Sequence, residues 1–318
     1  MTVQSGFLRS STIPVDISPT INFRTFVNGL SIMKLCRYGH IGKEQPGLIG
    51  RDGELRDLSG VITDLTPEQL CSDKLAALAK IDPRSLPLVE GTPRLGAPVH
   101  HIGKFIAIGL NYRDHAEEAG LAIPTEPIIF MKATSCISGH DDDIVEPIGS
   151  TKLDWEVELG IIIGSQARHV SEADALDYVA GYCVANDVSE RAFQFQSSQW
   201  DKGKGCDSFG PLGPWLVTKD EVVDPQNLDL WLDVNGERMQ TGNTSKMIFN
   251  VRQIISYCSK FMTLMPGDVI ITGTPPGVGM GFKPEPVWLK PGDIVELGIT
   301  GLGSQRQHVV ATAVVVHG

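Results

Sequence analysis

One segment constrains the fold more than any other, and it reads L-D-W-E-V-E-L-G-I-I-I-G from Leu153 to Gly164. Side chains alternate between the two faces of an extended strand, so Asp154, Glu156 and Glu158 would share one face. The apolar run 159–163 that follows is typical of a sheet interior. The segment therefore predicts a strand that carries acidic side chains into or beside a packed core.

Such a strand is costly unless its charges are balanced. Two carboxylates about 4 Å apart repel by roughly 4 kcal/mol at an effective dielectric near 20, and burial adds the cost of desolvation. The acids must then hold protons, meet basic partners or bind a cation. A solvated sheet face whose acids have no function is the alternative that this segment alone leaves open.

Charge and composition limit the possible partners. The chain has 318 residues, enough for one large domain or one domain plus a smaller one. Its net charge of -11 and pI near 5.2 argue against nucleic acid or an anionic membrane as a partner, and favour a small molecule. No apolar run approaches the ~20 residues of a membrane span.

Cysteine and histidine usage indicates a reducing compartment and no zinc site. The six cysteines form no C-x-x-C pair, and the eight histidines form no zinc-ligand spacing. We expect a cytoplasmic protein. The segment 1–32 is rich in Ser and Thr, and it is either an appended tail, which would allow a mitochondrial location if it is a transit segment, or a folded extension.

Turn and capping signals divide the rest of the chain. Short β-like runs fill 33–65, and Thr66-Pro67-Glu68-Gln69 predicts a helix that runs to about Lys80. The proline-rich stretch 82–99 is typical of a linker. We therefore predict a small β-rich unit with its linker at 33–99 and a main domain at 100–318.

A second helix is predicted at 250–262, with Phe261 among its inward residues. Two copies of one turn signal, L-M-P-G-D and L-K-P-G-D, should each open a strand, at Asp268 and Asp293.

A histidine and a glutamate follow the predicted strand 105–110. His115 and Glu118 are three residues apart, so in a helical turn they share a face and can hydrogen-bond. A carboxylate on one ring nitrogen holds a histidine in one tautomer, which suits a general base. A surface helix with an incidental pair of this spacing is the alternative.

A third group of polar residues follows the predicted strand 181–186. Asp187, Arg191 and Gln194 would lie along one helical face, and the guanidinium suits a substrate carboxylate. Asp187 could instead be a simple helix N-cap.

Two later segments complete the candidate site. Glycines on both sides of Lys204 would let the backbone approach a ligand while the ammonium reaches in, although a mobile loop with solvated lysines is the alternative. The segment T-G-T-P-P-G-V-G at 272–279 is interpreted as a rigid loop that presents Thr274 and backbone amides to the site.

These segments, in this order, resemble the fumarylacetoacetate hydrolase family. The motifs are G-L-N-Y-R-D-H-A-E-E, D-W-E-V-E-L-G, N-D-V-S-E-R-A-F-Q, K-G-K-G-C-D-S-F-G-P-L-G-P-W and T-G-T-P-P-G-V-G. The likeness covers about 104–300, and 33–65 resembles the small N-terminal domain of bacterial-type members. It implies an α+β, β-rich fold, a mixed-sheet β-roll with flanking helices, which is commonly a homodimer.

The resemblance also implies a set of site residues. It implies that Mg²⁺ or Mn²⁺, rather than Ca²⁺, is held by Glu156, Glu158 and Asp187. It implies that His115 and Glu118 form a water-activating dyad on a mobile lid. The substrate-contacting positions that it implies are Arg191, Gln194, Lys204 and Thr274. In the reaction that we expect, Lys204 is also a catalytic group.

The expected reaction is hydrolysis of a carbon–carbon bond. A 2-oxo acid is the expected small-molecule partner: an acylpyruvate or a 2,4-diketo-3-deoxy sugar acid would be cleaved to pyruvate and a carboxylic acid. Decarboxylation of an oxaloacetate-like acid and isomerisation of a hydroxydienoate use the same enolate chemistry and stay open as alternatives. A non-catalytic member with a structural cation is the alternative from another class.

Overall fold

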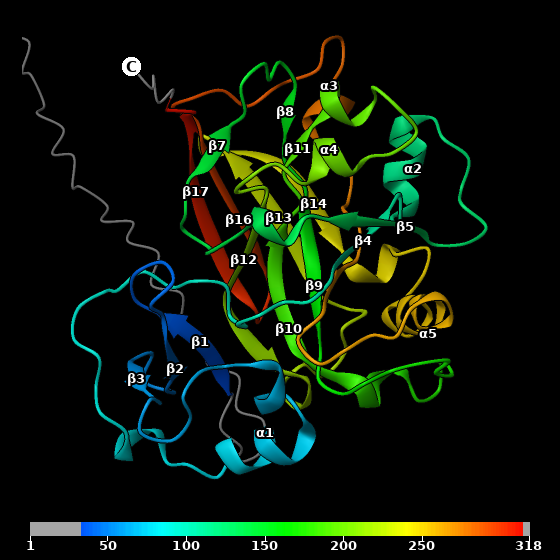
Figure 1. Ribbon diagram of the computed structural model, residues 1–318. Helices are drawn as coiled ribbons and strands as arrows, with labels where there is room; N and C mark the ends of the chain where they lie inside the picture. The colour runs from blue at the N-terminus through cyan, green and yellow to red at the C-terminus, as the bar shows by residue number, and fades with distance from the viewer. Residues whose placement is uncertain (1–32, 314–318) are drawn as a thin grey trace, which may run out of the picture. The chain divides into compact units, whose positions relative to one another are not determined.

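The computed structural model describes residues 33–313, and these form an α+β fold rich in strands (Figure 1). The predicted fold class is confirmed. The extension 1–32, on which two interpretations were open, lies outside the described residues. Within the described part, no helix is long and apolar enough to cross a membrane.

A ten-stranded mixed sheet forms the centre of the fold. Its strand order is β3-β2-β1-β12-β10-β9-β15-β4-β5, and β6 pairs with β12 beside this path. β15 runs parallel to β4, and β6 runs parallel to β12. The strands are β1 (Lys34–Tyr38), β2 (Gln45–Ile49), β3 (Leu55–Asp57), β4 (Phe105–Gly109), β5 (Ile128–Lys132), β6 (Ile137–Ser138), β9 (Val157–Ile163), β10 (Val179–Asn186), β12 (Gly210–Thr218) and β15 (Val269–Ile271).

The middle of this sheet is buried on both faces. Every residue of β9 and β10 is buried, which is why their sequences are almost continuously apolar instead of alternating. Each fully buried Leu, Ile or Val side chain contributes about 1.5–3 kcal/mol relative to exposure. The core therefore fixes the register of β9, and with it the direction of the acidic side chains at its start.

A second sheet packs over the middle of the first. Its order is β14-β13-β16-β17-β7, and its members contact β9, β10 and β12. The strands are β7 (Ile144–Glu146), β13 (Asp229–Val234), β14 (Glu237–Asn243), β16 (Ile294–Ile299) and β17 (Gly303–Ala311), and a small separate pair is formed by β8 (Leu153–Asp154) and β11 (Ser189–Glu190).

Helices are short and flank the sheets. They are α1 (Ser72–Leu78), α2 (Arg113–Ala119), α3 (Arg191–Gln194), α4 (Asp201–Lys204) and α5 (Val251–Phe261). α5 begins with the capping box of Asn250 and Gln253, and both P-G-D turns open strands as predicted. In each turn the aspartate accepts a hydrogen bond from a backbone amide three residues earlier, at 2.6 Å for Asp268 and 2.9 Å for Asp293.

Three local predictions were wrong. The helix expected from Thr66 is a separate 3-10 turn, Pro67–Gln69, followed by α1, and Thr66 makes no side-chain cap. Phe261, expected to face inward, is 65% exposed; it is the last residue of α5, and its ring packs against Tyr257. The strand expected over 153–164 is interrupted at residues 155–156, where the chain passes from β8 to β9.

The small N-terminal unit shares the main sheet. β1 pairs antiparallel with β12, so Lys34 lies opposite Val217. All of the described residues, 33–313, belong to one compact unit. The division of the chain into domains at residue 99 stays a prediction.

Candidate metal and catalytic site

Three carboxylates converge where β9 and β10 meet. In the antiparallel register Glu158 lies opposite Ala185, and the Asp187 amide donates to the Glu156 carbonyl at 2.9 Å, which continues the ladder. Residues two apart along a strand point to the same face, and so do residues directly opposite each other on paired strands. Glu156, Glu158 and Asp187 are all buried, and one oxygen from each lies within 4.8 Å of the others.

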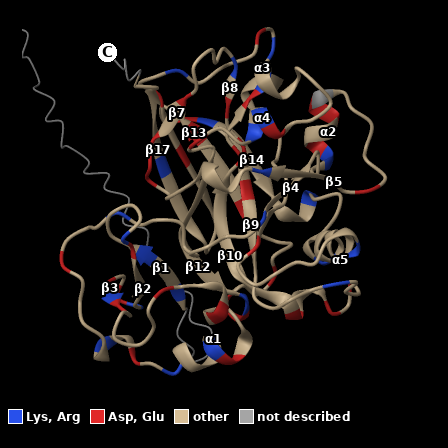
Figure 2. Ribbon diagram, viewed as in Figure 1, with Lys and Arg blue, Asp and Glu red and all other residues tan. Residues whose placement is uncertain are grey.

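Basic residues of α3, α4 and β5 form ion pairs with this carboxylate cluster, and Figure 2 marks the basic and acidic residues along the ribbon. The Lys204 ammonium donates to Glu156 Oε2 and to Asp187 Oδ2, both at 2.7 Å. Arg191 donates through Nη2 to Glu156 Oε1 at 2.6 Å. Lys132, at the end of β5, forms a short ion pair with Asp187.

The charges of these neighbours set the pKa values of the cluster. Burial raises the pKa of Glu156, but the charges of Lys204 and Arg191 outweigh that effect and lower it to about 2. Burial lowers the pKa of Lys204, but Asp187 and Glu156 outweigh it, so its pKa lies above the ordinary value. Both groups are therefore ionised at neutral pH.

Glu158 differs from its two neighbours. Burial, then the charges of Asp187 and Glu156, raise its pKa well above the ordinary value. Its carboxylate accepts a hydrogen bond from the Gly273 amide at 2.6 Å, and among the described residues it has no ion pair. Among the described residues, the cluster therefore contains one carboxyl group without a basic partner, and its raised pKa favours the protonated form.

This donor set fits a divalent cation. Carboxylate oxygens at this spacing are the ligands that Mg²⁺ and Mn²⁺ prefer, and a cation would balance the charge of Glu158. Tyr112 lies at the start of α2 and is buried. Its hydroxyl has no partner among the described residues, and burial together with Glu158 raises the pKa of the phenol. The phenol is therefore a neutral hydrogen-bond donor.

The predicted dyad is also formed. His115 Nδ1 lies 3.1 Å from Glu118 Oε2, and both residues are on α2. The Glu118 carboxylate also accepts from the Gly277 amide at 3.1 Å. With Nδ1 bonded to the carboxylate, Nε2 of the neutral imidazole is the nitrogen that can accept a proton.

The predicted substrate-contacting residues lie close to the cluster but are engaged with protein. Arg191 Nη1 donates to Gln194 Oε1 at 3.0 Å. The Thr274 hydroxyl donates to the Val157 carbonyl at 2.9 Å and accepts from Gln240 at 2.8 Å. Thr274 therefore anchors its loop to β9, whatever contact it makes with a ligand.

Two structural expectations about these residues were wrong. Asp187 is neither helical nor an N-cap, because it lies between β10 and β11, and Glu190 caps α3 instead. Gly203, the glycine before Lys204, was expected to let the backbone approach a ligand, but it packs closely against Gln194 of α3. A Cβ at Gly203 would lie 2.4 Å from the Gln194 amide nitrogen. Gly203 thus lets α4 pack against α3, which brings the ammonium of Lys204 to the cluster.

The sequence interpretation missed Lys132 and gave no role to Asp154. Lys132 is buried, and the only signal was a lysine at the end of an apolar run, which many exposed strand ends also show. Asp154 is fully buried and bonds Arg191 Nε at 2.8 Å.

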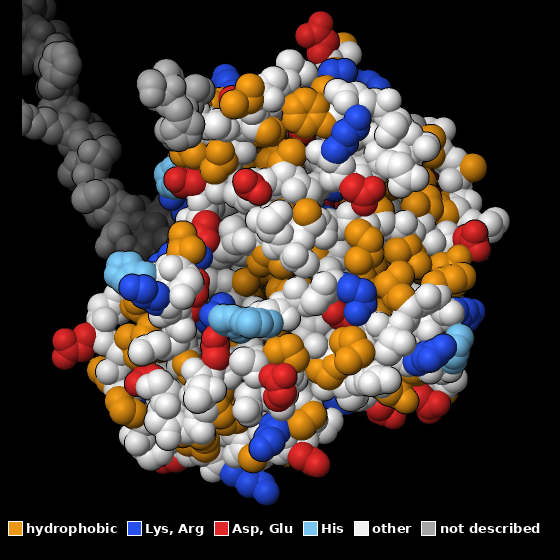
Figure 3. All heavy atoms as spheres, viewed as in Figure 1, with side chains coloured by type: hydrophobic (Ala, Val, Ile, Leu, Met, Phe, Trp, Pro, Cys, Tyr) orange, Lys and Arg blue, Asp and Glu red, His pale blue; other side chains and the backbone are white. Residues whose placement is uncertain are grey.

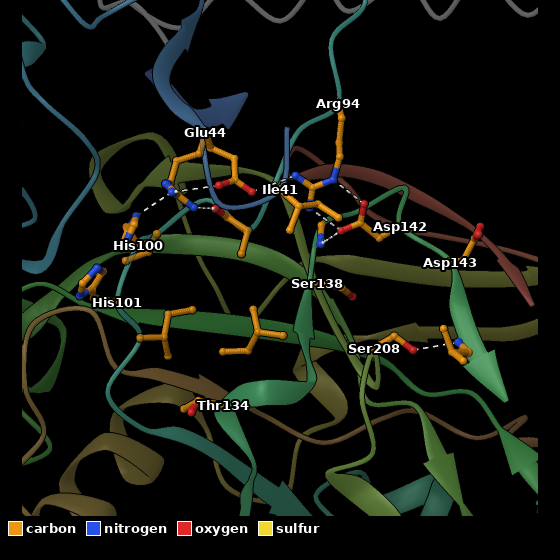
Figure 4. A pocket seen from close by; sticks show the side chains of 17 residues that line it. Ile41, Glu44, Arg94, His100, His101, Thr134, Ser138, Asp142, Asp143 and Ser208 are labelled. Atoms are coloured by element: carbon orange, nitrogen blue, oxygen red, sulfur yellow. Dashed lines mark hydrogen bonds and ion pairs between the residues drawn. The ribbon is translucent and has the colours of Figure 1, made fainter. Parts of the chain in front are cut away.

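A separate cavity of about 680 Å³ contains none of the predicted site residues (Figure 4). Its two arginines are paired with carboxylates: Arg94 with Glu44 at 2.9 Å and with Asp142 at 2.6 Å, and Arg37 with Glu44 at 3.4 Å. Because none of the predicted site residues lines this cavity, we place the candidate site at the carboxylate cluster.

Comparisons with known proteins give a consistent result. Residues 104–310 match the family model described as "Fumarylacetoacetate (FAA) hydrolase C-terminal". A Burkholderia lata protein named "Putative hydrolase" is 61% identical over 277 residues, which cover 87% of this chain and 98% of that protein.

Solved structures share the fold. A fumarylacetoacetate hydrolase from Exiguobacterium antarcticum is 35% identical with a TM-score of 0.78, covering 88% of this chain and 100% of that one. A maleylpyruvate hydrolase from Sphingobium sp. SYK-6, in complex with manganese (II) ion and pyruvate, is 29% identical with a TM-score of 0.74 and coverage of 88% and 100%. A 2-hydroxyhepta-2,4-diene-1,7-dioate isomerase from Mycobacterium marinum is 32% identical with a TM-score of 0.68 and coverage of 89% and 100%.

Proposed function

The chain belongs to the fumarylacetoacetate hydrolase family, and from this premise we propose that it hydrolyses a carbon–carbon bond of a 2,4-dioxo acid with a divalent cation. The products would be pyruvate and a carboxylic acid, and an acylpyruvate or a 2,4-diketo-3-deoxy sugar acid would be the substrate. The observation that carries the proposal is the buried convergence of Glu156, Glu158 and Asp187. The manganese and pyruvate bound by the Sphingobium relative support the same choice.

In this proposal Glu156, Glu158 and Asp187 hold Mg²⁺ or Mn²⁺. The cation, when bound, would polarise the 2-oxo group and help to disperse negative charge. The cation would carry two positive charges, and ionised Glu158 would neutralise one of them. An anionic substrate would neutralise the other. Arg191, supported by Gln194, would orient the substrate carboxylate.

His115 would act as the general base that activates water. Its Nε2 would take a proton from water while Glu118 stabilises the imidazolium through Nδ1–H. The hydroxide would add to the C4 carbonyl, and the C3–C4 bond would then break with its electron pair passing to C3 to give the enolate of pyruvate. Lys204 would donate a proton to C3 or stabilise the oxyanion, and its raised pKa keeps that proton available at neutral pH.

A substrate panel tests the proposal. Acylpyruvates, 2,4-diketo sugar acids, oxaloacetate and a hydroxydienoate would each be incubated with Mg²⁺, Mn²⁺ or a chelator, and products would be identified by mass spectrometry. We expect chelator-sensitive release of pyruvate from a 2,4-dioxo acid. The absence of chelator-sensitive turnover on every compound would remove the enzymatic proposal and favour a binding protein.

Isomerisation of a hydroxydienoate is the second candidate, favoured by the named activity of the Mycobacterium marinum relative. It needs proton transfer at carbon but no water attack. Incorporation of oxygen from ¹⁸O-labelled water into the carboxylic acid product therefore separates the two, because only hydrolysis incorporates it. Carbon dioxide release would instead identify an oxaloacetate-type decarboxylase.

A further inference from the structure

Three carboxylates hold one loop through its backbone amides. The loop 272–281 donates from Gly273 to Glu158 at 2.6 Å, and from Gly277 to Glu118 at 3.1 Å. It donates from Gly279 and Met280 to Asp154, at 2.7 and 3.1 Å. These acids come from β9, α2 and β8, so this loop physically links the carboxylate cluster to the dyad.

Asp154 uses its whole hydrogen-bonding capacity in these contacts. Oδ1 accepts from the amides of Trp155 and Gly279, at 2.8 and 2.7 Å. Oδ2 accepts from Arg191 Nε and the Met280 amide, at 2.8 and 3.1 Å. A carboxylate offers about four lone-pair positions, so Asp154 has none left for a cation or substrate, although it precedes Glu156 and Glu158 in the same motif.

We propose that Asp154 is a positioning residue that fixes where the His115–Glu118 dyad lies relative to the carboxylate cluster. Its Oδ1 and Oδ2 accept from the Gly279 and Met280 amides, and this fixes the position of the Gly277 amide, which donates to Glu118. Through Oδ2 it also orients Arg191, whose Nη2 holds Glu156. This inference rests on the proposed function, because it assigns Asp154 a role in that reaction.

The competing explanation is that Asp154 is only a structural buried carboxylate. The chain offers a matched control in Asp268, which is equally buried and accepts from the amides of Lys104 and Met265, at 2.8 and 2.6 Å. Asp268 also pairs with a cation, the Lys104 ammonium, at 2.6 Å. It holds the turn before β15, and its hydrogen bonds and ion pair among the described residues include none to the cluster, the dyad or the loop 272–281.

The test compares Asp154→Asn with Asp268→Asn. Both variants should lose thermal stability, since each leaves buried donors with a weaker acceptor. Only Asp154→Asn should speed hydrogen–deuterium exchange in α2 and in 277–281, and it should lower kcat by ~10- to 100-fold, the usual cost of losing a supporting partner. Asp268→Asn should keep kcat and the exchange of α2 unchanged.

Equal exchange in α2 and equal kcat for the two variants would overturn the proposal. If Asp154→Asn does not fold, Glu118→Ala tests the same link from its partly exposed end. The proposal then expects faster exchange at 279–280, and unchanged exchange there would refute it. Exchange does not depend on turnover, so a wild-type protein inactive on the whole panel would refute the proposed function and leave this comparison intact.

Discussion

Among the described residues, Glu158 is the one member of the carboxylate cluster without an ion pair, and this makes the stability of the folded protein depend on pH. A buried carboxylate with a raised pKa binds its proton more tightly in the folded state than in the unfolded chain. Stability from this group is complete below the unfolded pKa of ~4.3. It is lost as the pH rises from there through the higher folded pKa.

We therefore expect Glu158→Gln to stabilise the cation-free protein at neutral pH. The amide oxygen can still accept from Gly273, and the repulsion from Asp187 and Glu156 disappears. Thermal melts in chelator from pH 4 to 8 should show the gain over wild type growing with pH. The same variant should lose most of the thermal shift that Mn²⁺ gives the wild type, and a full shift would contradict the ligand assignment.

His115→Ala should separate chemistry from cation binding. Removal of the general base should lower kcat by ~10²- to 10⁴-fold, while the thermal shift with Mn²⁺ should stay at the wild-type value. Steady-state assays and calorimetric titration with Mn²⁺ measure the two effects. Retained hydrolysis would show that the dyad assignment is wrong.

At the scale of elements, the contact between α2 and the loop 272–281 depends on the absence of a side chain. A Cβ on Gly281 would lie 2.9–3.1 Å from the carboxyl group of Glu118. Glu118 is a flexible, partly exposed side chain, so it can move aside at little cost in stability. Moving it would break its bonds to His115 and Gly277.

Gly281→Ala should therefore reduce activity more than stability. We expect kcat to fall by ~10-fold or more, because the histidine loses the partner that holds its tautomer. Gly60→Ala is the matched control, since a Cβ there meets nothing within 4 Å. Equal kcat for both variants in the same assay would show that the docked Glu118 has no part in turnover.

At the scale of the whole molecule, the exposed edge of the main sheet bears on assembly. β5 ends the strand order, and its Ile128 is 36% exposed while Ile129, Phe130 and Met131 are only partly buried. Figure 3 shows hydrophobic atoms on the part of this face that lies over β5 and α5. Unpaired edge strands with apolar side chains favour association.

We expect a homodimer in which β5 is covered by a second copy. Sedimentation velocity should give twice the monomer mass of 34.4 kDa. Ile128→Lys should shift the equilibrium towards monomer, because a charge at this edge would have to be desolvated on association. A wild-type protein that sediments as a monomer at micromolar concentration would refute the expectation.

Local sequence patterns were sufficient to predict the core strands and the candidate site residues. Apolar runs such as 159–163 are typical of a sheet interior, so local pattern was sufficient to place the core strands. The motifs placed His115, Glu118 and the three candidate cation ligands, because each motif keeps its residues within a few positions. The helix start at Thr66 and the orientation of Phe261 were wrong, since packing at helix ends overrides local propensity.

Which charged side chains pair with each other depends on the tertiary fold. Asp187 reaches Glu156 because β9 and β10 pair in one particular register, and Lys132 reaches Asp187 from a strand 55 residues away in sequence. The role of Asp154 depends on a loop more than 120 residues later in the chain. Electrostatic and hydrogen-bond partners at such separations follow from sheet pairing and close packing, and the local periodicity of a sequence does not contain them.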